Sequence, residues 1–186
     1  LMLDGKIYYA DFETLGADKA NELIGCSVEF YCHSENNGVE KIIFMSKTDS
    51  NNILTIEKQN IYEISGTYLR YADGNANKNI NIFDCIALYN GQKCTFSKSV
   101  LDSVADGYID FIDNNGDGRY EVMNITSCSY YAADQVSIGN MTLTDKFTKN
   151  ILKSDEYENV FIYNEYGEKI LFSDIKNGNV VKIKKP

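Results

Sequence analysis

Hydrophobic and polar residues alternate in short runs along most of the chain, separated by Gly, Asn and Asp. In one run, Ile109 and Phe111 alternate with Asp110. This period of two is typical of strands that bury one face. The runs predicted as strands are residues 6–10, 27–32, 39–45, 53–57, 67–71, 79–83, 86–89, 93–96, 107–111, 120–125, 136–138, 141–143, 159–163, 169–172 and 179–183. Helix is expected only as single turns at residues 18–23 and 100–105, so the sequence predicts an all-β protein.

Parts of this pattern recur along the chain. The segment from Lys78 to Ser97 returns, with two short insertions, from Lys149 to Ser173. A strand led by glycine occurs three times, after Gly25, Gly107 and Gly178. Such self-similarity is the sequence signature of repeated structural units. We therefore expect the two segments to share one strand topology, with chance similarity among Asn- and Lys-rich strands as the alternative.

The recurrences divide the chain into three predicted units. Residues 1–60 form a partial β-barrel repeat, residues 61–133 a complete one and residues 134–186 a second partial one. The complete unit holds five to six predicted strands in about 70 residues, the size of a small OB-like or SH3-like barrel. The predicted architecture is a tandem array of such small barrels.

The most distinctive chemistry lies in the hairpin loop from Asp113 to Glu121 of the complete repeat. Its pattern D-x-N-x-D-G-x-x-E places oxygen-bearing side chains two positions apart, and a glycine stands where a calcium-binding loop turns sharply. The predicted calcium ligands are four side chains and one main-chain carbonyl, namely those of Asp113, Asn115, Asp117 and Glu121, and of Arg119.

The loop does not belong to an EF-hand. Position 12 is Asn124 instead of a bidentate Glu, and both flanks are predicted strands instead of helices. A plain turn accounts for the same residues, because Asn115-Gly116 and Asp117-Gly118 are common turn dipeptides. A weak calcium site and a polar hairpin turn both remain open.

Charge and cysteine spacing exclude several classes of function. The net charge of −9 disfavours nucleic acid and anionic membranes as partners, and no apolar run is long enough to span a bilayer. Of the five cysteines, none forms a C-x-x-C pair. An Asn90-Gly91 hairpin turn places Cys94 opposite Ala87 and not opposite Cys85. We therefore predict free, mostly buried thiols, and a solvated position for the single histidine, His33.

Three stretches resemble the β-rich regions of clostridial S-layer-homology-type (SLH) surface proteins. They are Leu88-Tyr89-Asn90-Gly91, residues 107–113 with Asp117-Gly118-Arg119-Tyr120-Glu121-Val122, and residues 174–181. The resemblance implies a secreted, non-catalytic module on the cell surface of a Gram-positive bacterium. Its implied partners are other modules of the same surface protein or a cell-wall polymer. The chain itself has no S-layer-homology repeat, so anchoring to the wall would belong to another part of the parent protein.

Three classes of function are therefore compared. A structural or adhesive β-module stabilised by one calcium ion needs only the features already described. A carbohydrate-binding module would stack sugars on surface tyrosines, although the chain has no tryptophan. The tyrosine candidates are Tyr8 with Tyr9, Tyr130 with Tyr131, and Tyr157 with Tyr166. A glycosidase using two carboxylates such as Asp110 and Glu121 is the least favoured, so we expect no enzyme.

Overall fold

The computed structural model describes residues 2–3, 6–10, 22–34, 40–154 and 161–184. Helix within these residues is limited to Glu22, the 3-10 residue Ser154, the short helix α3 (Lys98–Asp102) and two 3-10 turns, η1 (Lys58–Asn60) and η3 (Phe172–Asp174). Most of the remaining described residues belong to strands. The prediction of an all-β protein is therefore confirmed.

The strands follow the alternating runs closely. They are β1 (Met2–Leu3), β2 (Lys6–Ile7), β3 (Tyr9–Ala10), β4 (Val28–Ser34), β5 (Glu40–Lys47), β6 (Asn52–Glu57), β7 (Ile61–Ser65), β8 (Tyr68–Asp73), β9 (Ala76–Asn81), β10 (Ile86–Tyr89), β11 (Gln92–Lys93), β12 (Asp106–Asp113), β13 (Val122–Ser137), β14 (Thr142–Asp145), β15 (Ile151–Lys153), β16 (Phe161–Tyr163), β17 (Lys169–Ile170) and β18 (Val180–Lys184). β1, β7 and β15 are not predicted by the sequence, and residues 136–137 of the run predicted at 136–138 are the end of β13. The helical turn expected at 100–105 is α3, whereas most of 18–23 lies outside the described residues.

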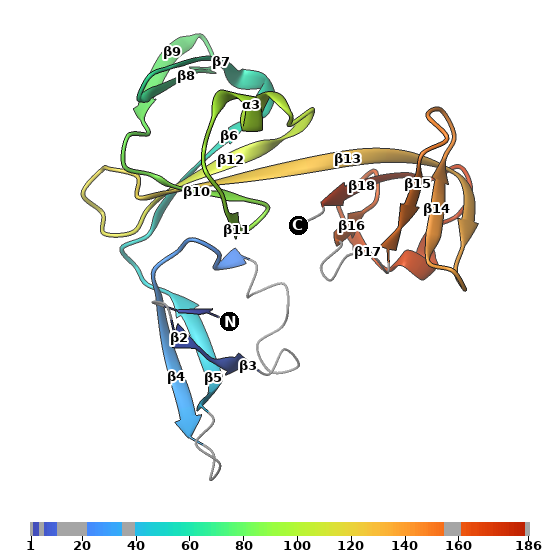
Figure 1. Cartoon of the computed structure of the whole chain (residues 1–186), viewed down its shortest axis with the longest axis horizontal. Coiled ribbons are helices and arrows are strands. Elements are labelled where there is room, and N and C mark those ends of the chain that lie inside the picture. Colours follow the sequence, from blue (N-terminus) through green and yellow to red (C-terminus); the bar gives the residue numbers. More distant parts are fainter. Residues whose placement is uncertain (1, 4–5, 11–21, 35–39, 155–160, 185–186) are drawn as a thin grey trace.

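Three groups of strands follow one another along the chain (Figure 1). In the first group, β4 pairs antiparallel with β5, and β3 lies parallel to β5. In the second group, β12 pairs antiparallel with both β6 and β13, while β10 lies parallel to β13. The antiparallel sheet β7-β8-β9 and helix α3 belong to the same group. The third group contains the antiparallel pair β14-β15 and the strands β16, β17 and β18, of which β16 pairs antiparallel with both β17 and β18.

The second group encloses the largest core of the described residues. Its fully buried side chains include those of Leu69, Leu101, Ile109, Phe111, Met123 and Ile125. The third group has a core of its own, which includes Ala133, Leu143, Leu152, Val181 and Ile183. The first group has a smaller one around Ile42 and Met45. Each group of strands therefore buries its own apolar face.

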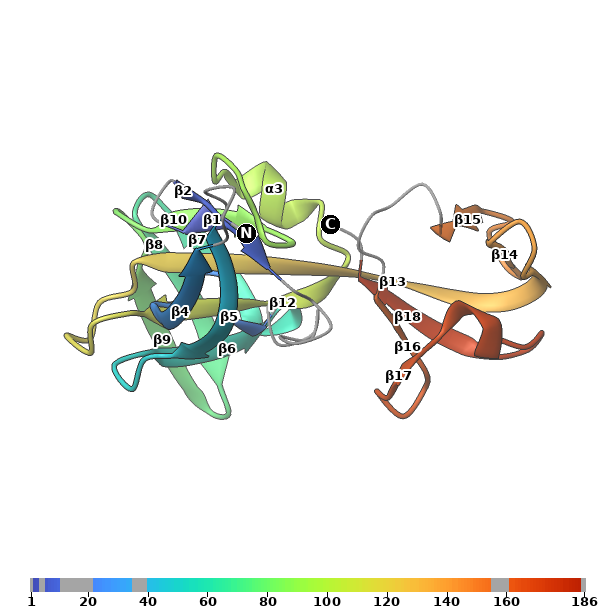
Figure 2. The same ribbon diagram turned by 90° about the horizontal axis from the view of Figure 1, so that it is seen from below.

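Strand β13 links the second and third groups (Figures 1 and 2). Its first half pairs with β12, its middle with β18 and its last residues with β14. The sheet that runs through β13 contains ten strands and curls into a half-barrel. One continuous strand therefore joins the core of the second group to the core of the third.

A pattern of strand pairing occurs twice. β3, β5 and β4 pair as β10, β13 and β12 do, with the first strand parallel and the last antiparallel to the central one. Phe30 faces Met45 in the first set, and Phe111 faces Met123 in the second. The register therefore places the same two residue types opposite each other in both groups.

The two similar segments agree in part of their pairing. β9 and β15 each pair with the strand before them, and β10-β11 and β16-β17 are both antiparallel hairpins. However, β10 lies parallel to β13, whereas β16 pairs antiparallel with β18. The prediction of a common topology for the two segments is therefore wrong in this last pairing, although the hairpins correspond.

Candidate metal centre

The acidic loop (residues 113–121) lies at the end of the β12-β13 hairpin, as the sequence predicts. The hairpin register pairs Ile112 with Val122 immediately before the loop. Gly116 has φ of 76° and Gly118 has φ of 85°. Residues with a side chain rarely adopt this left-handed conformation, so glycine is favoured at both positions. The turn expected at the second of these glycines is present.

Asp113 is the buried anchor of the loop, with 2% of its surface exposed. Its carboxylate accepts main-chain N–H groups from Asn115 at 3.2 Å, Gly116 at 2.7 Å and Gly118 at 3.0 Å. Burial acts to raise the pKa of this carboxyl, but these hydrogen bonds and one from the Asn52 side chain hold it below its usual range. Asp113 is therefore ionised at neutral pH.

Three of the predicted ligands converge in the loop. One carboxylate oxygen each from Asp113, Asp117 and Glu121 lies within 4.8 Å of the others. The Asp113 side chain is buried, that of Glu121 is half-buried and that of Asp117 is exposed. Like charges at such distances repel one another, and a cation among them would remove this repulsion. The arrangement could therefore hold a metal ion.

The other two predicted ligands, Asn115 and Arg119, form hydrogen bonds within the loop. The Asn115 side-chain oxygen accepts the Asp117 N–H at 2.9 Å, and its amide nitrogen donates to Glu121 at 3.1 Å. The Arg119 N–H donates to the Asp117 carboxylate at 2.8 Å. The hydrogen bonds of the Asp117 and Arg119 N–H groups fix the backbone of the loop, and the bond from Asn115 to Glu121 orients that carboxylate.

Asn114 is a residue of the loop that the sequence pattern does not single out. Its side-chain oxygen accepts the Ser27 N–H at 2.8 Å, and its amide nitrogen donates to the Gly25 carbonyl at 3.1 Å. Its own carbonyl accepts the Ser50 hydroxyl at 2.8 Å, and its N–H donates to Glu121 at 2.7 Å. One residue thus connects the acidic loop to two turns of the preceding strands.

A second amide completes this connection. Asn51 accepts the Ser27 N–H at 2.9 Å and donates to the Ser27 carbonyl at 2.8 Å. It also donates to the Thr48 carbonyl within the turn between β5 and β6. The acidic loop, residues 25–27 and residues 48–52 therefore form one polar joint between the first and second groups of strands.

The tyrosines considered for sugar binding do not form exposed pairs among the described residues. Tyr130 is 55% exposed, but its neighbour Tyr131 is buried because successive side chains of a strand point to opposite faces. Tyr8 packs edge-on against Phe30, with ring centroids 5.2 Å apart. Tyr166 is exposed, whereas Tyr157 and the Tyr9 side chain lie outside the described residues.

The cysteines are free thiols, as predicted. Only Cys128 is fully buried, so the prediction that most thiols are buried is wrong. Cys32 is exposed, and Cys26, Cys85 and Cys94 are half-buried. The Cys94 N–H donates to the Ala87 carbonyl, which confirms the predicted hairpin register. His33 is exposed near the end of β4, also as predicted.

No helix in the described part of the chain is long and apolar enough to cross a membrane. Comparison with known proteins finds no match to the chain among protein families, curated sequences or solved structures.

Proposed function

We propose that this chain is a non-catalytic, extracellular structural or adhesive β-module of a bacterial cell-surface protein, stabilised by one calcium ion in the acidic loop. The observation that carries the proposal is the convergence of Asp113, Asp117 and Glu121 on a loop whose backbone is already held by hydrogen bonds. A preorganised site costs less conformational entropy when the ion binds.

Calcium is the cation that suits this loop best. Its ligands would be oxygens of carboxylate, amide and main-chain carbonyl groups, from Asp113, Asn115, Asp117, Arg119 and Glu121. Calcium accepts six to eight such oxygens in flexible geometry, whereas magnesium requires a tight octahedron and retains its water. The exposed Asp117 leaves room for water ligands.

The place of the loop in the fold gives calcium a structural role. Asn114 connects the acidic loop to Gly25 and Ser27, and through Ser50 to the turn before β6. An ion that orders the loop would therefore also stiffen the joint between the first two groups of strands. A surface protein built from tandem small barrels, OB-like or SH3-like, needs such joints to keep its modules aligned. The repeated β3-β5-β4 and β10-β13-β12 pairing supports this architecture.

Thermal unfolding with and without calcium tests the proposal. At millimolar calcium, a site with a dissociation constant of roughly 10⁻⁴ M adds on the order of 1.4 kcal/mol to the free energy of unfolding. For a chain of this size the melting temperature then rises by roughly 3–5 °C. Asp117→Ala should abolish the rise without lowering the stability of the calcium-free protein, because it removes one of three like charges. A melting curve indifferent to calcium and to chelator would reduce the loop to a polar turn.

Carbohydrate binding by surface tyrosines is the second candidate. Tyr62, Tyr68, Tyr130 and Tyr166 are each exposed enough to meet a sugar ring. Single exposed tyrosines are common on β-proteins, so this observation weighs less than the three converging carboxylates. Binding of neutral oligosaccharides that disappears in Tyr130→Ala or Tyr166→Ala would favour it.

A further inference from the structure

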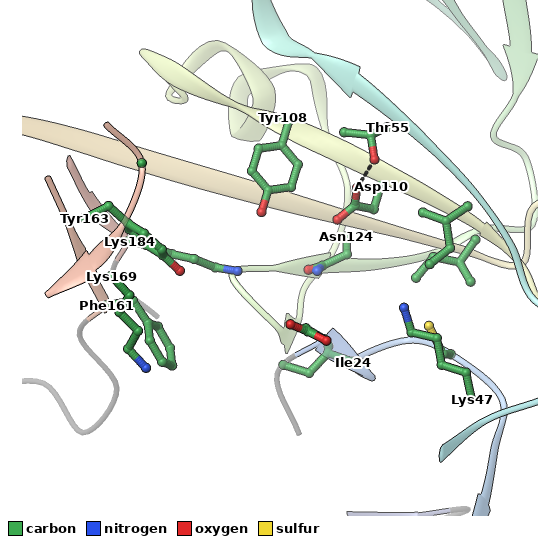
Figure 3. A pocket seen from close by; sticks show the side chains of 15 residues that line it. Ile24, Lys47, Thr55, Tyr108, Asp110, Asn124, Phe161, Tyr163, Lys169 and Lys184 are labelled. Atoms are coloured by element: carbon green, nitrogen blue, oxygen red, sulfur yellow. Dashed lines mark hydrogen bonds between the residues drawn. The ribbon is translucent and has the colours of Figure 1, made fainter. Parts of the chain in front are cut away.

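A polar hollow of about 590 Å³ lies where the three groups of strands meet (Figure 3). The first group contributes Glu22 and Lys47, and the third contributes Lys169 and Lys184. The floor between them comes from β12, whose Asp110 is one of the lining residues. The volume of the hollow lies within the range of small-ligand sites in proteins. No residue of the acidic loop lines the hollow.

The charge in the hollow is opposite to that of the chain as a whole. Lys47, Lys169 and Lys184 outnumber the two carboxylates of Glu22 and Asp110, whereas the chain carries a net charge of −9. The balance of charge among the lining residues is therefore positive, and a cleft attracts ligands whose charge is opposite to its own. The hollow therefore favours an anion.

Lys184 carries a half-buried ammonium group in the hollow. It is half-buried on β18, and its side chain extends into the hollow towards Asn124 (Figure 3). Burial lowers the pKa of its ammonium group, against the opposing influence of Cys128 and Asp110. Lys184 forms no ion pair within the described part of the chain. A partly desolvated cation without a carboxylate partner costs stability, so an external anion would relieve an existing cost.

Asp110 influences Lys184 electrostatically but forms no ion pair with it within the described residues. It accepts the Thr55 hydroxyl at 2.7 Å (Figure 3). Lys47, at the other end of the hollow, likewise forms no ion pair within the described residues. Lys169 differs from both, since its ammonium lies over the Phe161 ring, 4.6 Å from the centroid. Two lysine cations are thus available to a ligand.

The remaining lining groups suit a ligand rich in hydroxyls. Asp110, Thr55, Tyr108 and Asn124 offer both donors and acceptors on one floor (Figure 3). Phe161 adds an aromatic wall near Lys169. Hydroxyl groups that both donate and accept, together with a ring that has an apolar face, are the chemistry of a sugar.

We propose that this hollow binds an acidic saccharide that carries two carboxylates, one paired with Lys184 and the other with Lys47, and whose hydroxyls bind the side chains of β12 and the neighbouring strands. The site goes beyond the calcium-stabilised module, because it uses none of the predicted calcium ligands. It would give the chain a binding activity in addition to its structural role.

Calorimetric titration with two oligosaccharides tests the proposal. The acidic probe is a tetrasaccharide of alternating glucuronic acid and N-acetylglucosamine, and the neutral probe is a tetramer of N-acetylglucosamine. We expect the acidic probe to bind at least tenfold more tightly than the neutral one. Lys184→Met should weaken binding of the acidic probe at least tenfold, while Lys146→Met, at an exposed lysine outside the hollow, should not change it.

Stability measurements separate loss of the site from loss of the fold. Lys184→Met keeps the apolar part of the side chain and removes the desolvated charge, so its melting temperature should equal or exceed that of the unmodified protein. Lys47→Met is a second variant that should also weaken binding of the acidic probe. Asp117→Ala should bind the acidic probe normally, because it affects only the calcium loop.

Several results would overturn the proposal. These are no binding of the acidic tetrasaccharide, equal affinity for both probes, or unchanged affinity in Lys184→Met and Lys47→Met. Binding of inorganic phosphate or acetate as tight as that of the acidic tetrasaccharide would identify a simple anion site instead. None of these results would bear on the calcium response of the melting temperature, so the two proposals fail independently.

Discussion

Asn114 and Ser27 are 87 positions apart in the sequence, yet the Asn114 side-chain oxygen accepts the Ser27 N–H at 2.8 Å. The same asparagine donates to the Gly25 carbonyl. The acidic loop is therefore fastened to the turn that precedes β4. Whatever orders the loop also orders this turn.

Replacing Asn114 tests the polar joint. Asn114→Ala removes both side-chain hydrogen bonds, although Ser27 keeps a second acceptor in Asn51. We expect a loss of about 1–2 kcal/mol in the free energy of unfolding, measured by urea denaturation. Asn140→Ala, at an exposed asparagine, should change it by less than about 0.5 kcal/mol. Equal effects of the two substitutions would contradict the role of Asn114.

Asp145 should control the acid stability of the third group. Its carboxylate accepts N–H groups from Ala132 and Thr148 and the Thr148 hydroxyl, which lower its pKa to about 2. Because the folded pKa lies below the unfolded value of 3.8, this stabilisation is complete above that value and is lost as the pH falls towards 2. Asp145→Asn should lower the melting temperature at pH 7 and flatten its decline between pH 4 and pH 2, which thermal scans at several pH values can measure. A decline as steep as in the unmodified protein would contradict this assignment.

Three glycines form a graded series. A Cβ atom at Gly107, where φ is 151°, would lie 1.9 Å from the Thr126 carbonyl oxygen. At Gly118 a Cβ atom would meet no other atom, but φ is positive. At Gly139 a Cβ atom would also meet no other atom, and φ is not positive. Substitution by Ala should therefore cost at least about 3 kcal/mol at Gly107, about 1–2 kcal/mol at Gly118 and less than about 0.5 kcal/mol at Gly139. Denaturant unfolding measures this order, and a tolerated Gly107→Ala would contradict the close approach of β12 to β13.

The thiols should differ widely in reactivity. Cys32 is exposed, whereas Cys85 donates to the Tyr120 carbonyl at 2.8 Å. Burial, with the nearby Glu121 and Asp84 charges, raises the pKa of Cys85 to about 11. Its thiolate fraction at neutral pH is then about 100-fold below that of a free thiol. Alkylation of the native protein, mapped by mass spectrometry, should modify Cys32 first and Cys85 only after unfolding. Rapid modification of Cys85 would show that its side chain is accessible.

Local alternation predicts most of the strands but misses those where alternation fails. β7 carries a register shift between Ile61 and Glu63, which disrupts its period of two. β13 extends well beyond the predicted residues 120–125 because its first half is buried on both faces and its second half changes partners. The sequence pattern does not specify such changes of partner, since they depend on tertiary packing.

The acidic loop was predictable because its chemistry is local. Asp113, Asp117 and Glu121 lie within nine residues, and their spacing alone brings the carboxylates together. The sequence pattern does not identify Asn114 as a connecting residue, because its partners lie far away in the sequence and the calcium pattern places no constraint on that position. The sequence does not predict the hollow either, since Lys47 and Lys184 come from strands that are far apart in the sequence.

Strand β13 determines how the molecule would respond to a pulling force. Its 16 residues extend over roughly 50 Å, with Ile125 in the core of the second group and Ala133 in the core of the third group. Antiparallel ladders with β12 and β18 hold it over successive stretches. Tension along β13 would load these hydrogen bonds in shear, so that many must break together instead of one after another. Strand β13 is already extended, so it would transmit a pulling force from the core of the second group to the core of the third with little change in its own length.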